Sequence, residues 1–286
     1  MNTILNQTIR LPQGGFELLR DLVHERTGLY FDDARNGVFL DKLSPLLGEN
    51  PSESFLEYFH FLKYDSQSAV EWRKVFDALT VRESFFWREM EQIHALVDEI
   101  VPAYFKAHPN DTLNIWSAAC AAGCEPLTIA MALDEEGWFD RAKINIYASD
   151  ASPRAIEAAH NGVYRDHSFR RLPPALKEKY FRYAGGTGEE RLSHVSCSLH
   201  SRICWQITNL VSEADLALAP MTSPVIFCRN VFIYFSQYAA RKTVRAFAGT
   251  MPSPGYLFVG TAESLMNVSS AFELREIRGA FVHVRS

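Results

Sequence analysis

From residue 113 onward, short apolar runs of strand length alternate with segments of helical periodicity. The runs typical of buried strands are 113–116, 144–148, 225–228, 256–259 and 281–284. Helical segments separate them, most clearly over 126–133 and 237–250. Parallel strands need crossover connections, which are usually helices. The alternation therefore predicts an α/β fold with a doubly wound, mainly parallel sheet.

The first 79 residues, in contrast, carry helical patterns only. Apolar residues at helical spacing run from Phe16 to Val23, and Gly28 stands where such a helix would end. A second helix is expected over 37–47. Asn50-Pro51-Ser52-Glu53 has the cap, the early proline and the acid of a helix start, and Ser66 is placed to cap the next helix. These patterns predict a small all-helical domain.

The middle of the chain departs from both patterns. Ile93 to Phe105 forms the clearest helical face in the chain. Between about 164 and 205 the alternation of strand and helix breaks down. This stretch holds a glycine-rich turn at Gly185-Gly186-Thr187-Gly188 and short strand-like runs over 192–205. We expect a small antiparallel β insertion there.

Composition argues against several classes of function. The formal net charge of −5 is opposite to that of a nucleic-acid-binding polycation, and the longest apolar runs are far shorter than a membrane span. The N-terminus has no basic region before an apolar core, as a signal peptide would. Five cysteines, an odd number, favour reduced thiols in the cytoplasm. Cys120 and Cys124 have no second Cys/His pair at zinc-ligand spacing, so no metal site is expected.

Small residues fill the loop after the first expected strand, from Ser117 to Gly123. They let the backbone come close to a ligand, and the loop opens a helix whose N-terminus favours polar or anionic groups. The loop lacks the GxGxxG fingerprint of dinucleotide sites. On its own, a tight turn packed with alanines is therefore the simpler interpretation.

Asp150 changes that balance because it ends the second expected strand of the same βαβ unit. An acid there commonly bonds the two hydroxyls of a ribose, although capping of the helix that starts at Ser152-Pro153 explains Asp150 alone equally well. Loop and acid together favour an adenosine-type cofactor. Glu125 is either a surface acid favoured by the helix dipole or a partner for a cationic amine on the ligand.

The apolar run 225–228 stops at Arg229-Asn230, and the apolar run that follows holds one phenol, Tyr234. Ligands of open α/β sheets bind outside the carboxyl ends of the strands. Arg229 and Asn230 are therefore expected at a ligand-binding edge.

Several segments, in order along the chain, resemble motifs of the CheR-type chemotaxis-receptor methyltransferases. Thr80 to Glu89 is similar to the family's T-x-N-E-T-x-F-F-R-D/E segment, and Trp116 to Pro126 to its W-S-A-A-C-S-T-G-E-E-P loop. The other matching segments are Ala148-Ser149-Asp150 with Gly162-Val163-Tyr164, then Asn209-Leu210, and then Phe227 to Phe235, which is close to F-C-R-N-V-x-I-Y-F. The resemblance covers nearly the whole chain.

This resemblance implies a domain organisation. A Rossmann-like S-adenosylmethionine-dependent methyltransferase domain is expected over 93–286, with the β insertion at about 164–205. The N-terminal helical domain would cover 1–79, and a linker that contacts the cofactor would cover 80–92.

The implied activity is that of a protein-glutamate O-methyltransferase, which forms glutamate methyl esters on a chemoreceptor and leaves S-adenosylhomocysteine. Carried over residue by residue, the family's cofactor contacts fall on Arg82, Ser84, Arg88, Glu125, Asp150, Asn209, Leu210, Arg229 and Asn230. We expect Arg88 to pair with the incoming carboxylate or that of the cofactor, and Tyr234 to donate its hydroxyl to the substrate carboxylate. Arg82 stands where the family usually has Asn, and Ser84 where it has Thr.

The resemblance also implies partners. The helical domain would contribute to recognition of the acid-rich methylation helices of the receptor, with Arg35, Lys42 and Lys63 as candidates, although a solvated face is the simpler interpretation of any one of them. In some members of the family the β insertion docks a receptor C-terminal peptide, which would add to the edge of the sheet as a strand.

Two other classes of function compete with this one. A catalytically weak, cofactor-binding regulator of a chemosensory pathway would use the same fold, but the presence of Arg88, Asp150, Asn230 and Tyr234 argues against it. A nucleic-acid or small-molecule methyltransferase is the other. Amino-methylating DNA enzymes usually show a Pro-Pro pair and an aromatic after the catalytic strand, where this chain has Arg229-Asn230-Val231.

Overall fold

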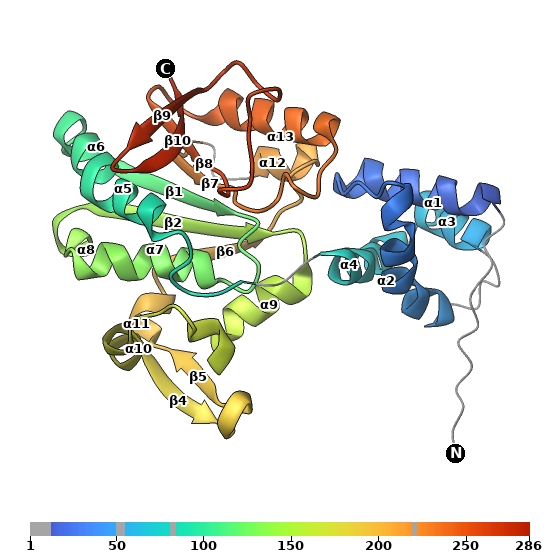
Figure 1. The fold of residues 1–286 in the computed structure, drawn as a ribbon, viewed down its shortest axis with the longest axis horizontal. Coiled ribbons are helices and arrows are strands. Elements are labelled where there is room, and N and C mark those ends of the chain that lie inside the picture. Colours follow the sequence, from blue (N-terminus) through green and yellow to red (C-terminus); the bar gives the residue numbers. More distant parts are fainter. Residues whose placement is uncertain (1–12, 50–54, 81–83, 219–221) are drawn as a thin grey trace. The chain divides into compact units, whose positions relative to one another are not determined.

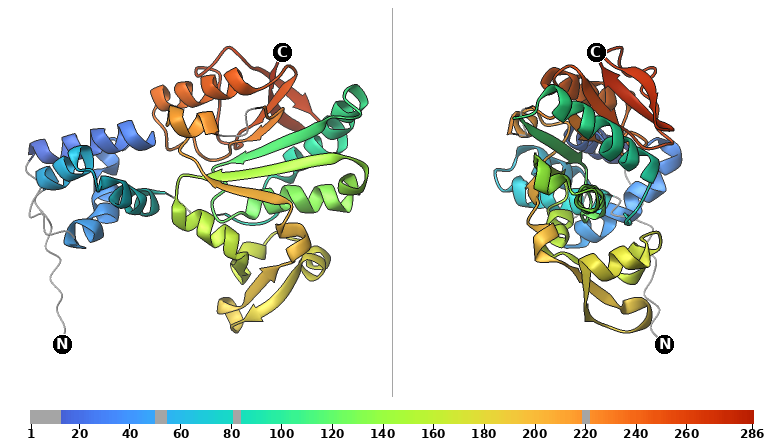
Figure 2. Two further views of the ribbon diagram at one scale, coloured as in Figure 1. Left: turned by 180° about the vertical axis from the view of Figure 1, so that it is seen from behind. Right: turned by 90° about the vertical axis from the view of Figure 1, so that its left-hand side faces the viewer.

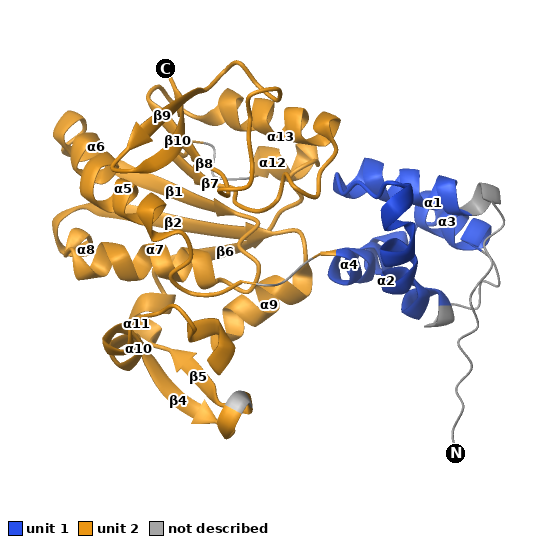
Figure 3. Cartoon of the chain, in the orientation of Figure 1, with its two compact units in different colours: residues 1–79 blue, residues 80–286 orange. Residues whose placement is uncertain are grey.

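The computed structural model describes residues 13–49, 55–80, 84–218 and 222–286 (Figure 1). The chain divides into two compact units, Met1–Leu79 and Thr80–Ser286 (Figure 3). No helix in these described ranges is long and apolar enough to cross a membrane.

The first unit is helical. Its elements are α1 (Gln13–Thr27), a 3₁₀ turn η1 (Asp33–Arg35), α2 (Asn36–Glu49), α3 (Phe55–Tyr64) and α4 (Ser68–Leu79). Apolar faces of the four α-helices meet in one core, which includes Leu19, Phe39, Tyr58 and Val75. The predicted first two helices are confirmed, and Gly28 follows α1 with a φ of +77°.

Two expected helix starts in this unit have different outcomes. The start at 50–53 lies outside the described residues. Ser66 lies in the turn before α4, and the carboxylate of Asp65 accepts the hydrogen bond there, from the Gln67 N–H at 2.7 Å. The cap predicted at Ser66 is therefore wrong, because the neighbouring acid provides the acceptor for this turn.

The second unit is built on a seven-stranded sheet with the order β6-β2-β1-β7-β8-β10-β9. The strands are β1 (Thr112–Ala118), β2 (Lys143–Asp150), β6 (Ile203–Ile207), β7 (Val225–Phe227), β8 (Gly255–Phe258), β9 (Glu273–Ile277) and β10 (Ala280–Arg285). The first five strands in the sheet order are parallel, and β10 and β9 pair antiparallel. The predicted doubly wound sheet is confirmed.

Helices cover both faces of this sheet (Figure 1). The elements α5 (Met90–Ala95), the π-helical turn η2 (Leu96–Ile100), α6 (Val101–Ala107) and α7 (Cys124–Glu135) share an apolar core with Leu113 and Ile115 of β1. On the other face, α13 (Gln237–Thr250) packs against Trp116 and Ile226, with the short α12 (Glu213–Leu218) beside it. Alternate residues of β1 therefore point to opposite faces, as in any strand that is buried on both sides.

Two further helices flank β2. They are α8 (Trp138–Arg141), which precedes it, and α9 (Pro153–Asn161), which follows it. The hydroxyl of Ser152 accepts a hydrogen bond from the Ala155 N–H and caps α9.

A three-stranded antiparallel sheet with the order β3-β5-β4 follows α9. It lies to one side of the main sheet in both views of Figure 2, where it is yellow. Its elements are β3 (Val163–Arg165), η3 (Asp166–Phe169), α10 (Pro174–Tyr180), β4 (Phe181–Gly185), η4 (Gly188–Glu190), β5 (Leu192–Val195) and α11 (Cys197–His200). The expected small antiparallel sheet is present, but β6 is not part of it. It pairs parallel to β2 at the edge of the main sheet. As an edge strand, β6 is partly exposed and has the same sequence pattern as a solvated antiparallel strand.

Candidate active site

The polar residues singled out in the sequence follow the carboxyl ends of β1, β2, β6 and β7. Because these strands are neighbours and run parallel, their carboxyl ends lie along one edge of the sheet. Residues far apart in the sequence therefore come together there, where open α/β sheets bind ligands.

The loop after β1 has an unusual backbone. Ala119 and Ala121 have φ angles of +66° and +49°, and Gly123, which precedes α7, has +90°. Residues other than glycine rarely adopt such angles, and they do so where the surrounding contacts enforce them. Contacts with its surroundings therefore hold the loop in a strained conformation.

Asp150 provides one of these contacts and a second one to the loop after β2. One carboxylate oxygen accepts the Ala121 N–H at 2.9 Å, and the other accepts the Ser152 N–H at 2.9 Å. Ser152 itself caps α9, so Asp150 joins the loop after β1 to the loop after β2. Its predicted bond to a ribose stays a prediction.

Arg229 lies in a cluster of charged side chains at this edge. Its Nε atom is 3.1 Å from Glu125 Oε2 and 3.6 Å from Glu89 Oε2, and its Nη2 donates to the Arg88 carbonyl at 3.0 Å. The Arg229 side chain is only 3% exposed. The Ser117 hydroxyl donates to Glu125 Oε1 at 2.7 Å. Arg229 thus holds Glu125 and Glu89 in place, and its predicted cofactor contact stays a prediction.

Buried groups of both signs in this cluster lack a hydrogen bond from the described residues: Glu89 Oε2, and Nε and Nη1 of Arg229. Burial raises the pKa of Glu125, and the charge of Arg229 and the hydrogen bond from Ser117 oppose that rise. Glu89 adds to it. Burying acids is costly unless positive charge compensates them. A ligand that carries an ammonium or sulfonium group would supply such charge.

The segment Ser84 to Glu89 is anchored on this second unit. Phe86 is fully buried against Tyr164 and Phe169, and Trp87 and Glu89 have φ angles of +69° and +53°. Ser84 lowers the pKa of the Cys124 thiol at the start of α7, against the larger effect of burial.

Arg88 contacts Glu89 at 3.7 Å and keeps 32% of its side chain exposed, so it is accessible to a second carboxylate. Arg82, the remaining predicted contact in this part of the chain, lies outside the described residues.

Asn209 and Leu210 follow β6, as the motif requires. The Asn209 side-chain oxygen accepts the Val211 N–H at 3.2 Å. The backbone N–H of Asn209 donates to the Asp215 carboxylate at 2.9 Å. The Leu210 side chain is buried in the core against α13, and its carbonyl accepts from Thr243. The hydrogen bonds of these residues fix the course of the chain at the edge of the sheet.

Asn230 and Tyr234 belong to the loop after β7. Asn230 is left-handed, with a φ of +60°. Residues 232–234 form a turn in which the Tyr234 N–H donates to the Val231 carbonyl at 3.0 Å. The phenol of Tyr234 is half-buried, and its hydroxyl makes no hydrogen bond to any residue that the structure describes.

Sequence reasoning missed two acids at this edge. Glu89 was part of a recognised motif without a role of its own, and it lies 3.6 Å from Arg229. Glu263 follows β8 and accepts backbone hydrogen bonds from the loop that contains Asn230. The available signal was that an acid shortly after a fourth parallel strand must lie near the same edge.

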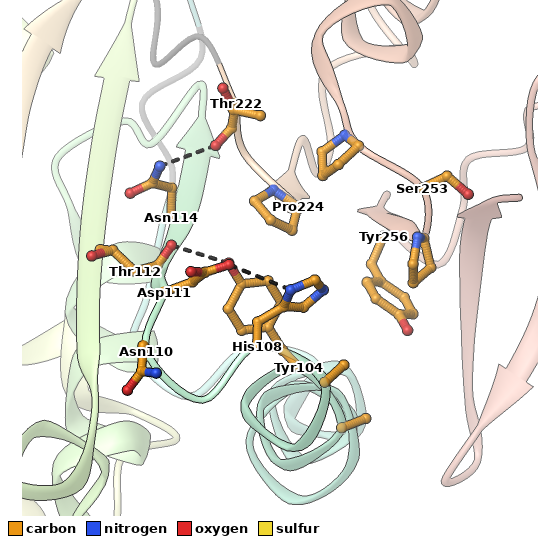
Figure 4. Close-up of a pocket in the computed structure, with 14 residues that line it drawn as sticks. Tyr104, His108, Asn110, Asp111, Thr112, Asn114, Thr222, Pro224, Ser253 and Tyr256 are labelled. Carbon is orange, nitrogen blue, oxygen red and sulfur yellow. Dashed lines mark hydrogen bonds and ion pairs between the residues drawn. The ribbon is translucent and has the colours of Figure 1, made fainter.

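A separate cavity of about 640 Å³ lies at the opposite edge of the sheet, where β1, β7 and β8 begin (Figure 4). Its polar groups bond one another: the Tyr104 hydroxyl donates to the Thr112 carbonyl at 3.2 Å, and His108 lies 3.4 Å from Asp111. None of the predicted site residues lines it. Among the described residues there is also no group of three or more His, Cys, Asp or Glu that could hold a metal ion.

Comparison with known families decides what this edge belongs to. The family model for the CheR methyltransferase, SAM binding domain, matches residues 82–281, and the model for the CheR methyltransferase, all-alpha domain, matches residues 14–80. The chain belongs to the CheR methyltransferase family. The domain that matches over 82–281 is the one that binds S-adenosylmethionine. The buried acids of the charged cluster fit the ammonium and sulfonium groups of this cofactor.

Individual relatives agree with this assignment. The chain is 32% identical to chemotaxis protein methyltransferase 2 of Vibrio cholerae, over 91% of this chain and 88% of that protein. It is 30% identical to chemotaxis protein methyltransferase 1 of Pseudomonas aeruginosa, over 91% of this chain and 93% of that protein. It is 27% identical to the chemotaxis protein methyltransferase of Escherichia coli, over 95% and 91% of the two chains.

Proposed function

We propose that this CheR-family protein transfers a methyl group from S-adenosylmethionine to glutamate side chains of a chemoreceptor. The observation that carries the proposal is the buried cluster of Arg229, Glu125 and Glu89, which joins three family motifs at the ligand-binding edge of the sheet. The enzyme would act in the cytoplasm, on the methylation helices of the receptor.

The cofactor, when bound, supplies a methyl group on a positively charged sulfur. Glu125 would bind its ammonium group, and Asp150 its ribose. Asn209, Leu210 and Asn230 would line the same site. Ser84 would contribute its hydroxyl to the same site. The substrate glutamate is already ionised at neutral pH, since its ordinary pKa is about 4.3, so no general base is needed.

Two residues would act on the substrate carboxylate. The guanidinium of Arg88 would pair with it, and the hydroxyl of Tyr234 would donate to it. Neutralisation of sulfonium and carboxylate in the transition state is favoured by a site that excludes water and aligns the reactants. The buried Arg229 side chain indicates such exclusion of water at the base of the site.

Methyl transfer to a receptor fragment tests this proposal. Wild-type protein with tritiated cofactor is expected to form base-labile methyl esters, which are lost when the target glutamates of the fragment are changed to glutamine. Arg88→Ala and Tyr234→Phe are expected to lower kcat by about 10- to 1,000-fold while cofactor binding persists. A base-stable product, or wild-type rates in both variants, would contradict the assignment.

The basic residues of the helical unit differ in their suitability for receptor binding. Arg35 and Lys63 are exposed. Lys42 instead donates to the Leu79 carbonyl at 2.9 Å, and burial lowers its pKa. We therefore expect Arg35→Glu and Lys63→Glu to raise KM for the receptor fragment, and Lys42→Ala to act mainly on stability.

The small antiparallel sheet is a candidate dock for a receptor C-terminal peptide. No described strand pairs with the outer side of its edge strand β4, and a hollow of about 620 Å³ beside it is lined by residues that include Lys177, Tyr183 and Arg191. An acidic peptide would add as a strand to β4 and face the positive charges of Lys177 and Arg191. Arg191→Glu is expected to weaken peptide binding, whereas Arg275→Glu on β9 of the main sheet is not. Equal affinity of all three proteins would remove this role.

A further inference from the structure

A single carboxylate, that of Glu263, organises the loop after β7. Its Oε2 atom accepts the N–H groups of Asn230 at 2.7 Å and Gly260 at 2.6 Å. Its Oε1 atom accepts those of Val231 at 2.8 Å and Ile233 at 3.3 Å. Four backbone donors from the loops after β7 and β8 thus converge on one side chain. This is an unusual concentration of charge-assisted hydrogen bonds for a residue outside the known motifs.

The two loops also approach each other closely. A Cβ atom at Gly260 would lie 2.6 Å from Asn230 Nδ2 and 2.9 Å from Glu263 Oε2. Asn230 is held at a φ of +60°, a left-handed backbone conformation that residues other than glycine rarely adopt. The glycine leaves room for the Asn230 amide, and the Glu263 carboxylate binds the backbone of the same residue. Together they fix the direction in which the Asn230 side chain points.

The same loop carries Tyr234. Within the segment between β7 and α13, two backbone hydrogen bonds form a turn. The Tyr234 N–H donates to the Val231 carbonyl, and the Phe235 N–H donates to the Phe232 carbonyl. Glu263 also accepts hydrogen bonds from Val231, which directly precedes this turn, and from Ile233, which lies within it. The carboxylate therefore links the residue proposed to bind the cofactor with the residue proposed to orient the substrate.

We infer that Glu263 is a positioning residue for methyl transfer, which acts through Asn230 on the cofactor and through the 231–235 turn on the Tyr234 hydroxyl. This inference rests on the proposed function for its effect on rate. Both oxygens accept two N–H groups each, so an amide would set its own N–H₂ against two donors. A carboxylate is required at this position, and a glutamine of the same shape does not replace it.

The test compares Glu263→Gln with Gly260→Ala and with a control at the opposite edge of the sheet. Glu263→Gln is expected to lower kcat by about 10- to 100-fold, the scale of a small misplacement of reacting groups. It should also raise the dissociation constant of S-adenosylhomocysteine by several-fold, measured by calorimetry. Gly260→Ala leaves Glu263 in the chain but places a methyl group against both the Asn230 amide and the Glu263 carboxylate, so the same two defects are expected. Tyr104→Phe removes the bond to Thr112 and should lower stability without changing kcat.

A double-mutant comparison separates positioning from general destabilisation. If Glu263 acts through Tyr234, the loss of kcat in Glu263→Gln with Tyr234→Phe is smaller than the product of the two single losses. Wild-type kcat and cofactor affinity in folded Glu263→Gln, or multiplicative losses in the double variant, would overturn the inference. If wild-type protein methylates no receptor fragment, the proposed function fails, and the S-adenosylhomocysteine affinity still decides whether Glu263 positions Asn230.

Discussion

Arg229 Nε lies 3.1 Å from Glu125 Oε2, with 3% and 14% of the two side chains exposed. This pair joins the end of β7 to the start of α7. Glu89, at 3.6 Å from the same nitrogen, joins the segment before α5 to both. One buried cation therefore connects three segments that contain family motifs, and it does so beside two acids that would otherwise repel each other.

Removing this cation should be strongly destabilising. Arg229→Met leaves Glu125 buried without its ion-pair partner and Glu89 with Arg88 alone, and we expect a loss of about 3 to 5 kcal/mol in the free energy of unfolding. Urea unfolding followed by circular dichroism measures it. Arg275→Met is the control, because Arg275 pairs with Glu273 on the surface and the pair should contribute less than about 1 kcal/mol. Equal losses in the two variants would mean that the buried pair contributes no more to the free energy of unfolding than the surface pair.

Cofactor binding should depend on pH through Glu125. Burial raises the pKa of this carboxyl above its ordinary value, so the folded state binds its proton more tightly than the unfolded state. The contribution of Glu125 to folding stability is therefore greatest at low pH and declines as pH rises through the raised pKa. Binding of a cationic amine needs the ionised form and has the opposite dependence.

The affinity for S-adenosylhomocysteine is accordingly expected to weaken as pH falls through the raised pKa of Glu125. Calorimetry at a series of pH values measures this change. Glu125→Gln should bind more weakly at neutral pH and lose most of the pH dependence. If the variant keeps the wild-type pH profile, Glu125 is not the group that binds the cation.

The elements that the sequence predicted best are those buried on both faces. The strands β1, β2, β7 and β8 are rich in apolar residues, and the sequence predicts each of them within a few residues of its bounds. The strand β9 was not expected, because Glu273–Ile277 is an exposed edge with no apolar alternation. An exposed edge strand is held to its neighbour by backbone hydrogen bonds. Its side chains therefore need not show the apolar pattern by which a strand is predicted.

The site was predictable to a similar degree. Motifs gave the residues at the ends of β1, β2, β6 and β7, and parallel topology places those ends together. The partners were not predictable. The contacts of Arg229 with Glu125 and Glu89 depend on the directions of side chains from three separate segments. The role of Glu263 depends on backbone N–H groups, which every residue type except proline has, so the sequence does not mark them. Such contacts become visible only in three dimensions.

Cysteine reactivity should separate into two groups. Cys120, Cys124 and Cys228 are buried, and Cys197 and Cys204 are exposed. Burial raises the pKa of Cys124 to about 12 and those of Cys120 and Cys228 well above the usual value, so their thiolates are scarce at neutral pH. A thiol reagent at about pH 8 should modify Cys197 and Cys204 in the native protein and the buried three only after denaturation. Fast modification of Cys124 in the folded protein would contradict this burial.

Two glycines with similar backbones provide a matched test of the loop after β1. Gly123 and Gly137 have φ angles of +90° and +66°, but a Cβ atom at Gly123 would lie 2.7 Å from the Trp205 ring, whereas at Gly137 it meets nothing within 4 Å. Gly137→Ala should cost about 1 kcal/mol of stability through backbone strain alone. Gly123→Ala adds a clash with Trp205, and overpacking of this kind costs about 1 to 3 kcal/mol more.

The position of Gly123 adds a second expectation. It precedes α7 directly, and a shift of the loop there would move Glu125 relative to Arg229. Gly123→Ala should therefore weaken S-adenosylhomocysteine binding, measured by calorimetry at a temperature where both variants are folded, while Gly137→Ala binds as the wild type does. If Gly123→Ala is destabilised but binds with wild-type affinity, the loop tolerates the displacement, and its close packing against Trp205 serves the fold rather than the ligand.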